Sequence, residues 1–441
     1  MHFSSPHSLE SYLQSQESAG SRVDSGAFTL DRAKALQKIA EHGSPFDHAW
    51  VVELGRAAKL LGAGKLHVYQ QSKETFISFH PSQQPEGNFE QLFFDPSRNM
   101  GCAGTTALRR ALWLAGLGEK RPFQLTLPGK DRSLLWNGTN LLALTATPAP
   151  NLSLTVSQRT TSQGQGVFLI RNIQSAIYST QLLSAMRKTL YPLPFPVMVD
   201  NRPISGWGNS ETHGYGAHRN PLKIAGFDIG GPPILPPPES SEKTMEQHDK
   251  LRPLSHGFKH QMLHEPQSVV VLLTAHGGLY QGGKSSTWRS DPAASELFWV
   301  KDGVVTQREK LNLSERCVSL AIHVCADDIP TDITGFGLQE DVVAPRRQAA
   351  MRKVDEWLQE IDHHFHVIDQ DWYRLKKRAA AAAVVGGVCL KFVIPPLGVP
   401  LAIAGVIGGA HVFQGPEALC EKFEKEFESL RKDFSSVVEG L

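Results

Sequence analysis

The chain has 441 residues, of which 41 % are hydrophobic and 20 % are charged. This length exceeds one ordinary hydrophobic core and suits two or three domains. The 45 basic and 44 acidic residues leave a net charge of +1, so no global field draws the protein to nucleic acid. Five cysteines without a CxxC pair argue against a disulfide framework and favour a reducing cytoplasm.

The first 26 residues are polar and lack the basic and apolar segments of a secretory signal, so we expect a disordered tail. Residues 27–150 are expected to form the first domain. A helix starting at Thr29 or Asp31 ends at Gly43, and a second helix covers Asp47 to Leu61. The apolar residues of the second helix recur at three- and four-residue steps, which predicts one buried face, made by Val51, Leu54, Ala58 and Leu61.

Alternating apolar patterns predict the remaining strands of this domain. A helix follows the polar loop after the second strand and is expected over 105–115. Helices and strands in this order indicate an α+β sandwich, with helices on one face of a mixed sheet. The expected strands cover 66–69, 75–79, 122–127, 133–136 and 141–146.

A second α/β domain is expected over 151–345, with one helix at 177–190. It is interrupted at about 205–265 by a long Pro- and Gly-rich insertion without periodicity, which indicates a functional loop or disorder. The proline run at 232–238 suits a stiff spacer or the docking of a partner. The strands expected here lie at 167–170, 197–199, 269–274, 296–300 and 318–324.

The C-terminal residues 346–441 have the pattern of an α-helical hairpin. Two amphipathic arms, Arg346–Arg378 and Glu417–Leu441, flank an apolar tip at 379–413. Basic residues precede the tip, as at a membrane surface, whereas a buried tip would pack against protein. Both alternatives stay open, so we expect a cytoplasmic protein that is peripheral to the inner membrane if the tip meets lipid.

The segments 28–39 and 47–68 resemble bacterial relatives of the ninety-kilodalton heat-shock chaperone, which have the GHKL (Bergerat) ATP-binding fold. The resemblance implies a Bergerat-type sandwich in the first domain, with ATP and magnesium as cofactors. It implies that Glu53 is catalytic and orients the attacking water. The position of the family's magnesium-binding Asn holds Ala57, which has no oxygen to offer a hard cation. The adenine-contacting Asp is absent, because His80-Pro-Ser-Gln follows the second strand.

A further segment, Gly101-Cys-Ala-Gly-Thr-Thr, resembles the Gly-x-x-Gly turn that precedes a helix in the family's lid. Two glycines before a helix N-terminus let backbone amides approach a phosphate. The resemblance extends through Tyr191–Ile204 and Pro330–Leu338 and so covers about 27–345. It implies that nucleotide is bound by Ala57, Gly101, Gly104, Thr105 and Thr106.

Each of these candidates also has a structural interpretation. Glu53 can pair with a nearby Arg or Lys, the glycines can serve a tight turn, and Thr105 or Thr106 can cap the helix. Asp362 and His366 share a helix face, and His256, His260 and His264 step by four, but neither group predicts a metal site because no partner cluster is apparent.

Three functions follow as hypotheses. The first is a chaperone-like protein whose degenerate ATP-binding domain serves as a conformational or scaffolding module for a protein partner. The second is an active GHKL-type ATPase that uses Glu53. The third is a membrane-acting effector of a bacterial stress or defence system, acting through 379–413. A homodimer is compatible with each of the three.

Overall fold

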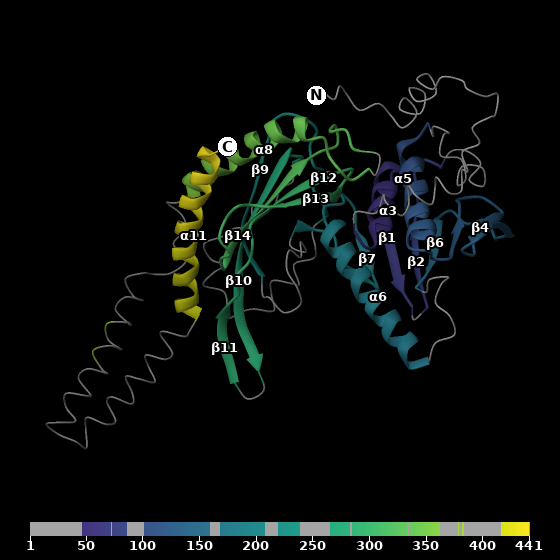
Figure 1. Cartoon of the computed structure of the whole chain (residues 1–441), viewed down its shortest axis with the longest axis horizontal. Helices are drawn as coiled ribbons and strands as arrows, with labels where there is room; N and C mark the ends of the chain where they lie inside the picture. The colour runs from purple at the N-terminus through teal and green to yellow at the C-terminus, as the bar shows by residue number, and fades with distance from the viewer. Residues whose placement is uncertain are drawn as a thin grey trace, which may run out of the picture.

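The computed structural model describes residues 46–71, 73–85, 101–158, 168–207, 219–238, 265–282, 285–332, 335–361, 378, 382 and 416–440. They form two mixed β-sheets with helices packed on them, which confirms the expected α+β class (Figure 1). The expected N-terminal tail, the helix at 29–43, the two histidine groups and nearly all of the apolar tip at 379–413 lie outside these residues.

The first sheet has eight strands in the order β5-β4-β3-β6-β2-β1-β7-β8. All neighbouring strands pair antiparallel except β1 and β7, which run parallel with Leu66 opposite Val197. The strands are β1 (Leu66–Gln70), β2 (Glu74–Phe79), β3 (Phe123–Thr126), β4 (Arg132–Trp136), β5 (Leu141–Thr145), β6 (Leu152–Ser157), β7 (Val197–Val199) and β8 (Arg202–Pro203).

The first sheet extends beyond residue 150, where we expected the second domain to begin. Strand β6 lies between β3 and β2, and β7 and β8 form one edge. The prediction of a strand at 167–170 is wrong for residues 168–170, because they begin helix α6 (Phe168–Thr189), which also contains most of the expected helix at 177–190. A short apolar run fits a buried strand and a helix turn equally well, so its periodicity could not decide.

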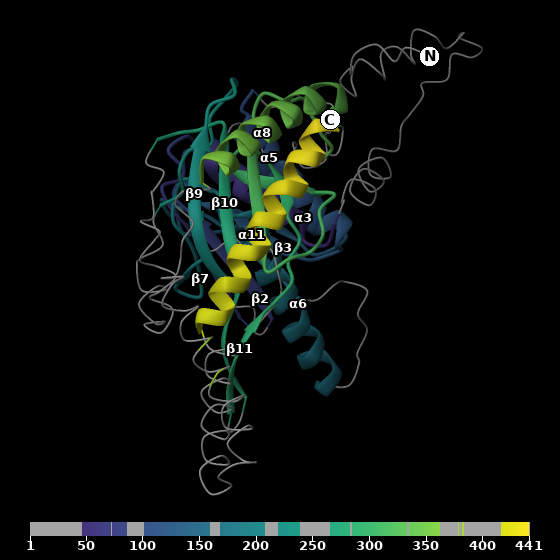
Figure 2. The same cartoon turned by 90° about the vertical axis from the view of Figure 1, so that its left-hand side faces the viewer.

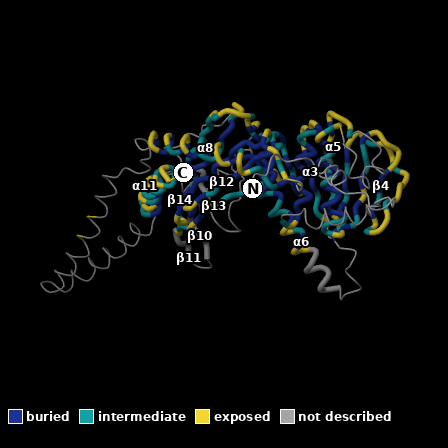
Figure 3. Tube along the Cα trace, turned by 45° about the horizontal axis from the view of Figure 1, so that its top comes forward, coloured by how far each residue is buried: buried dark blue, intermediate teal, exposed yellow. Residues whose placement is uncertain are grey.

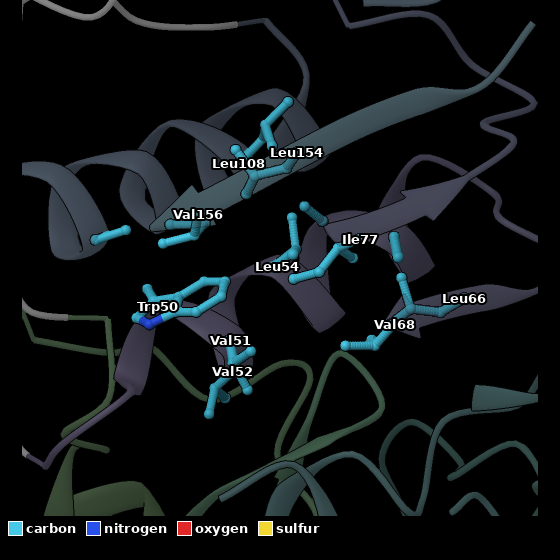
Figure 4. Packing of buried hydrophobic residues seen from close by; sticks show 14 of the residues in the cluster. Trp50, Val51, Val52, Leu54, Leu66, Val68, Ile77, Leu108, Leu154 and Val156 are labelled. Carbon is cyan, nitrogen blue, oxygen red and sulfur yellow. The ribbon is translucent and has the colours of Figure 1, made fainter. Parts of the chain in front are cut away.

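Helix α3 (Ala49–Leu60) is buried on every side rather than on one face. All residues from Ala49 to Ala58 are buried. Figure 4 shows Trp50 and Leu54 pointing toward Val156, Leu154 and Ile77, whereas Val51 and Val52 point the opposite way. The opposite side of α3 packs on the second β-sheet, which contains Val304. A Cβ on Gly55 would lie 3.2 Å from a methyl carbon of Val304. A helix enclosed in this way must bury its polar residues as well.

The start of α3 is stabilised by the carboxylate of Glu119. The Glu119 side chain accepts a hydrogen bond of 2.8 Å from the His48 backbone N–H. A negative charge at this position also interacts favourably with the helix dipole. Arg121 holds the same carboxylate at 2.7 Å, and the hydrogen bonds from His48 and Arg121 hold the pKa of Glu119 below its ordinary value although burial acts against them.

Helix α5 (Ala103–Trp113) lies directly against α3 and continues into the short π-helix η1 (Leu114–Gly118). The close approach occurs at Gly104, where a Cβ would lie 2.7 Å from the Leu61 side chain and 3.1 Å from the Leu60 carbonyl carbon. Glycine at this position therefore lets the two helices touch.

The second sheet has the strand order β11-β10-β14-β12-β13, and β9 pairs with β10. Strands β12 and β14 run parallel, and the other pairs are antiparallel. Strand β9 lies within the insertion expected at 205–265, so that stretch contributes to the sheet. The strands are β9 (Arg219–Phe227), β10 (Val269–Gly282), β11 (Ser285–Ser290), β12 (Glu296–Lys301), β13 (Val304–Lys310) and β14 (Val318–Cys325).

Two helices from the C-terminal region cover one face of this sheet. Helix α8 (Glu340–Glu360) and helix α11 (Pro416–Glu439) contact each other and share one hydrophobic cluster with β10 and β14 (Figures 1 and 2). The apolar stripe expected in the second arm is buried at Phe423, Phe427 and Phe434. Helix α8 starts before the expected Arg346, and Pro345 is its sixth residue, so the helix lacks the backbone hydrogen bond that this position would donate to the Asp341 carbonyl.

Buried segments lie inside both sheet-and-helix units and between them, and exposed segments lie around the outside, including the edge near β4 (Figure 3). In the part of the chain that the structure describes, no helix has both the length and the apolar character to cross a bilayer.

The other face of the second sheet carries a buried histidine among aromatic rings. The His323 ring stacks on Phe298 at 4.9 Å and meets Trp207 and Tyr191 edge-on. Its Nδ1 lies 3.3 Å from the Val270 carbonyl, and its Nε2 is hydrogen-bonded to the Tyr191 hydroxyl. Burial without a neighbouring carboxylate lowers the pKa of His323 from 6.5 to about 3.

Because burial lowers the pKa of His323, we expect the free energy of unfolding to fall in acid. Between pH 6.5 and about pH 3 the unfolded chain binds a proton that the folded chain rejects, so the free energy of unfolding falls as pH falls. The largest slope from one such group is about 1.4 kcal/mol per pH unit. When urea unfolding is measured between pH 7 and pH 4, the free energy of unfolding should depend less steeply on pH in His323→Phe than in wild type. Replacing the exposed His80 by Phe should keep the wild-type slope.

The contact at Gly104 gives a second prediction. Gly104→Val should lower the free energy of unfolding by about 2 kcal/mol, because the added carbons collide with Leu61 and with the backbone at Leu60. The matched control is Gly64→Val, since a Cβ there meets nothing within 4 Å. Equal stability of the two variants in urea unfolding would contradict the close helix contact.

Candidate functional site

Glu53 lies in the middle of α3, at the junction with the second sheet. Its side chain has 0 % exposure, and Oε1 lies 2.6 Å from Nη1 of Arg56, one helical turn further on. Oε2 is buried and has no hydrogen-bond partner among the described residues. One oxygen of this carboxylate is thus committed to an ion pair, and the other is unsatisfied.

Arg56 connects α3 to the second sheet. Its Nη2 and Nε donate to Asp302 Oδ2 at 2.8 and 3.1 Å, and its Nη1 donates to the Gly335 carbonyl at 3.2 Å. Asp302 and Gly303 have positive φ angles of 51° and 77°, as in the tight turn of a two-residue hairpin between β12 and β13. The turn therefore fixes the position of the carboxylate that receives Arg56.

A second arginine approaches the cluster from α5. A Cβ on Gly335 would lie 2.4 Å from Arg110 Nη1 and 3.5 Å from Glu53 Oε1, and Gly335 has a φ of +80°. Glycine is thus required by both space and backbone conformation. Burial raises the pKa of Glu53 above its ordinary value, while the charges of Arg56 and Arg110 oppose that rise.

The other predicted site residues lie elsewhere along α3 and α5. Ala57 belongs to the buried hydrophobic cluster of the first sheet. Gly104 touches the end of α3, Thr105 is fully buried, and the Thr106 hydroxyl donates to the Cys102 carbonyl of its own helix at 3.3 Å. Gly101 is exposed just before α5. The Thr106 hydroxyl is therefore bonded within its own helix, and the Ala57 and Thr105 side chains are buried.

The position where the resemblance places the magnesium ligand offers no oxygen. A hard cation takes oxygen ligands, and Ala57 provides none among its apolar neighbours. The described part of the chain contains no group of three His, Cys, Asp or Glu residues that could hold a metal ion.

Most of this cluster was not predicted from the sequence. Glu53 was a candidate site residue, whereas Arg56, Arg110 and Asp302 were not. Two sequence signals could have found them: the i,i+3 spacing of Glu53 and Arg56 on one helix, and the Asp302-Gly303 pair, which is a strong hairpin signal. The contact between α3 and that hairpin is long-range, and no local pattern encodes it.

Comparisons with known proteins give structural likeness only. No family model and no curated protein matches the chain. The N-terminal domain of a DNA repair protein shares 12 % identity at a TM-score of 0.36, over 74 % of this chain and 98 % of that chain. The ATPase domain of the Aquifex aeolicus mismatch repair endonuclease MutL shares 8 % identity at a TM-score of 0.28, over 64 % of this chain and 90 % of that chain.

The ATPase region of Saccharomyces cerevisiae topoisomerase II is a third such structure, with 8 % identity and a TM-score of 0.33 over 66 % of this chain and 75 % of that chain. Two of these three structures are named as an ATPase domain and an ATPase region, and all three likenesses are distant. None of the three is a heat-shock chaperone, so the chaperone branch remains a hypothesis from the sequence.

Removing one charge of the cluster should lower the stability of the protein strongly, and removing its partner as well should restore most of the loss. Arg56→Met should lower the free energy of unfolding by about 3–5 kcal/mol, because it leaves the Glu53 carboxylate buried without its counter-charge. Glu53→Leu combined with Arg56→Met should recover most of that loss, since the buried charge is then gone as well. Urea unfolding measures both variants.

The control for this pair is Lys310→Met, which breaks the exposed ion pair with Glu315 and should leave the free energy of unfolding close to that of wild type. A loss for Arg56→Met no larger than that of Lys310→Met would contradict the assignment of a buried, structurally required ion pair.

Proposed function

We propose that this protein is a conformational or scaffolding module for a protein partner, built on a degenerate ATP-binding domain of the GHKL kind. The observation that carries the proposal is the buried ion pair between Glu53 and Arg56. Its carboxylate is 2.6 Å from Arg56, fully buried, and tied through Arg56 to Asp302 of the second sheet. The residue that would activate water instead joins two structural units.

The chemistry of hydrolysis supports the same conclusion. A general base must reach the water that it deprotonates within hydrogen-bond distance. Glu53 has no exposed surface, and one of its oxygens is held by a guanidinium. Ala57, one turn further along α3, leaves magnesium without the ligand that the resemblance requires. A site with these residues suits structural coupling better than phosphate chemistry.

The second candidate function is an active ATPase that uses Glu53. It is favoured by the buried Glu53 Oε2 without a partner among the described residues, and by the pKa of this carboxyl, which burial raises. Catalytic carboxylates show both features, although buried ion-pair networks show them as well. Partner binding through the proline-rich segment or the apolar tip remains a proposal from the sequence.

Titration calorimetry and a phosphate-release assay separate the two candidates. With Mg·ATP added to the full-length protein, we expect no binding heat and no phosphate release above that of a Glu53→Gln variant. Micromolar binding together with hydrolysis that Glu53→Gln abolishes would reject the module and establish the ATPase. The exposed Glu315→Gln serves as the control, since it should leave either result unchanged.

A further inference from the structure

Two turns of the second sheet meet helix α3 at its polar side. The first segment, Lys301–Gly303, contains the last residue of β12 and the turn that joins β12 to β13, and the second, Cys325–Ile329, begins at the end of β14. Helix α3 contacts both turns, because Arg56 binds Asp302 and Lys59 Nζ lies 3.1 Å from Asp327 Oδ2. We call these two segments the paired turns.

The paired turns are bonded tightly to each other. Lys301 Nζ donates to the carbonyls of Ala326, Asp327 and Ile329 at 3.0, 3.0 and 2.7 Å. The Asp302 backbone N–H donates to Asp327 Oδ1 at 2.6 Å. All three protons of a largely buried ammonium group are thus used to join one turn to the other, so the two segments are held together as one unit.

Helix α8 holds the same unit from the opposite side. Arg346 donates to the Cys325 carbonyl at 3.1 Å and to both oxygens of Asp328 at 2.5 and 2.7 Å. Bidentate pairs of this kind fix orientation as well as distance. The adjacent carboxylates Asp327 and Asp328 therefore each serve a different helix, α3 of the first unit and α8 of the second.

The contacts continue from α8 into α11. Ser435 on α11 donates to Asp355 at 2.6 Å and accepts from Gln359 at 2.9 Å. Together with the shared hydrophobic cluster, these bonds hold the two C-terminal helices against each other. Side-chain contacts thus connect α3 to the start of α8 through the paired turns, and the far end of α8 bonds to α11.

We propose that the paired turns are a coupling joint, through which a displacement of α8 and α11 is transmitted to α3 and the reverse. The inference rests on the proposed function as a conformational module and specifies how that module is regulated. A partner that binds the C-terminal helices would change the stability of α3 through Arg346, Asp328, Asp327 and Lys59, without touching the first unit. Coupling of this kind is reciprocal.

Hydrogen–deuterium exchange of the full-length protein without nucleotide tests the joint. Arg346→Met should accelerate amide exchange in α3 around Arg56–Leu60 by about fivefold or more, in addition to exchange in α8. Lys59→Met should accelerate exchange in the first half of α8 to a similar extent. The control is Arg347→Met, which loses pairs with Glu309 and Glu340 but none with the paired turns; its α3 exchange should match wild type.

Asp328→Asn provides a second route, because it weakens the same contact from the other side and should reproduce the effect of Arg346→Met on α3. Exchange in α3 that stays at the wild-type rate in both variants would overturn the joint. The result is distinguishable from a failure of the proposed function: nucleotide binding in calorimetry rejects the module alone, whereas unchanged α3 exchange rejects the joint alone.

Discussion

The enclosure of α3 between two sheets is the constraint on which the rest of the structure depends. A helix buried on all sides cannot expose Glu53 and Arg56 to water, so each must find a counter-charge within the protein. Glu53 accepts a hydrogen bond from Nη1 of the Arg56 guanidinium, and Asp302 of the second sheet accepts from its Nε and Nη2. Folding of α3 into the first unit and docking of the second unit are therefore linked by one arginine.

The same constraint accounts for the glycines around the junction. Gly55 allows α3 to approach Val304, Gly104 allows α5 to approach the end of α3, and Gly335 leaves room for Arg110. Each would otherwise place a Cβ within 3 Å of a neighbouring atom. Glycine near a helix N-terminus, which in the sequence indicates a phosphate site, here serves helix packing at Gly104. Nucleotide chemistry and close packing favour the same residue type, so the sequence alone could not separate them.

The strongly periodic elements were predictable, and the long-range contacts were not. Helix α3, the β3–β5 meander and the amphipathic faces of α8 and α11 follow from spacing alone, because each depends on local patterns of burial. Strand β9 was missed within a segment rich in proline and glycine, since its identity as a strand depends on pairing with β10. Glu53 was found through its place on the helix, whereas Asp302 and Gly335 join it only in the folded chain.

The central claim is that Glu53 and Arg56 hold two units together and do not process a nucleotide. The most direct measurement is the thermal unfolding temperature of the wild-type protein as Mg·ATP is raised to millimolar concentration. A ligand that binds the folded state must raise that temperature as its concentration increases. The account predicts an unfolding temperature independent of Mg·ATP, and a rise that is concentration-dependent and lost in Glu53→Gln would contradict it.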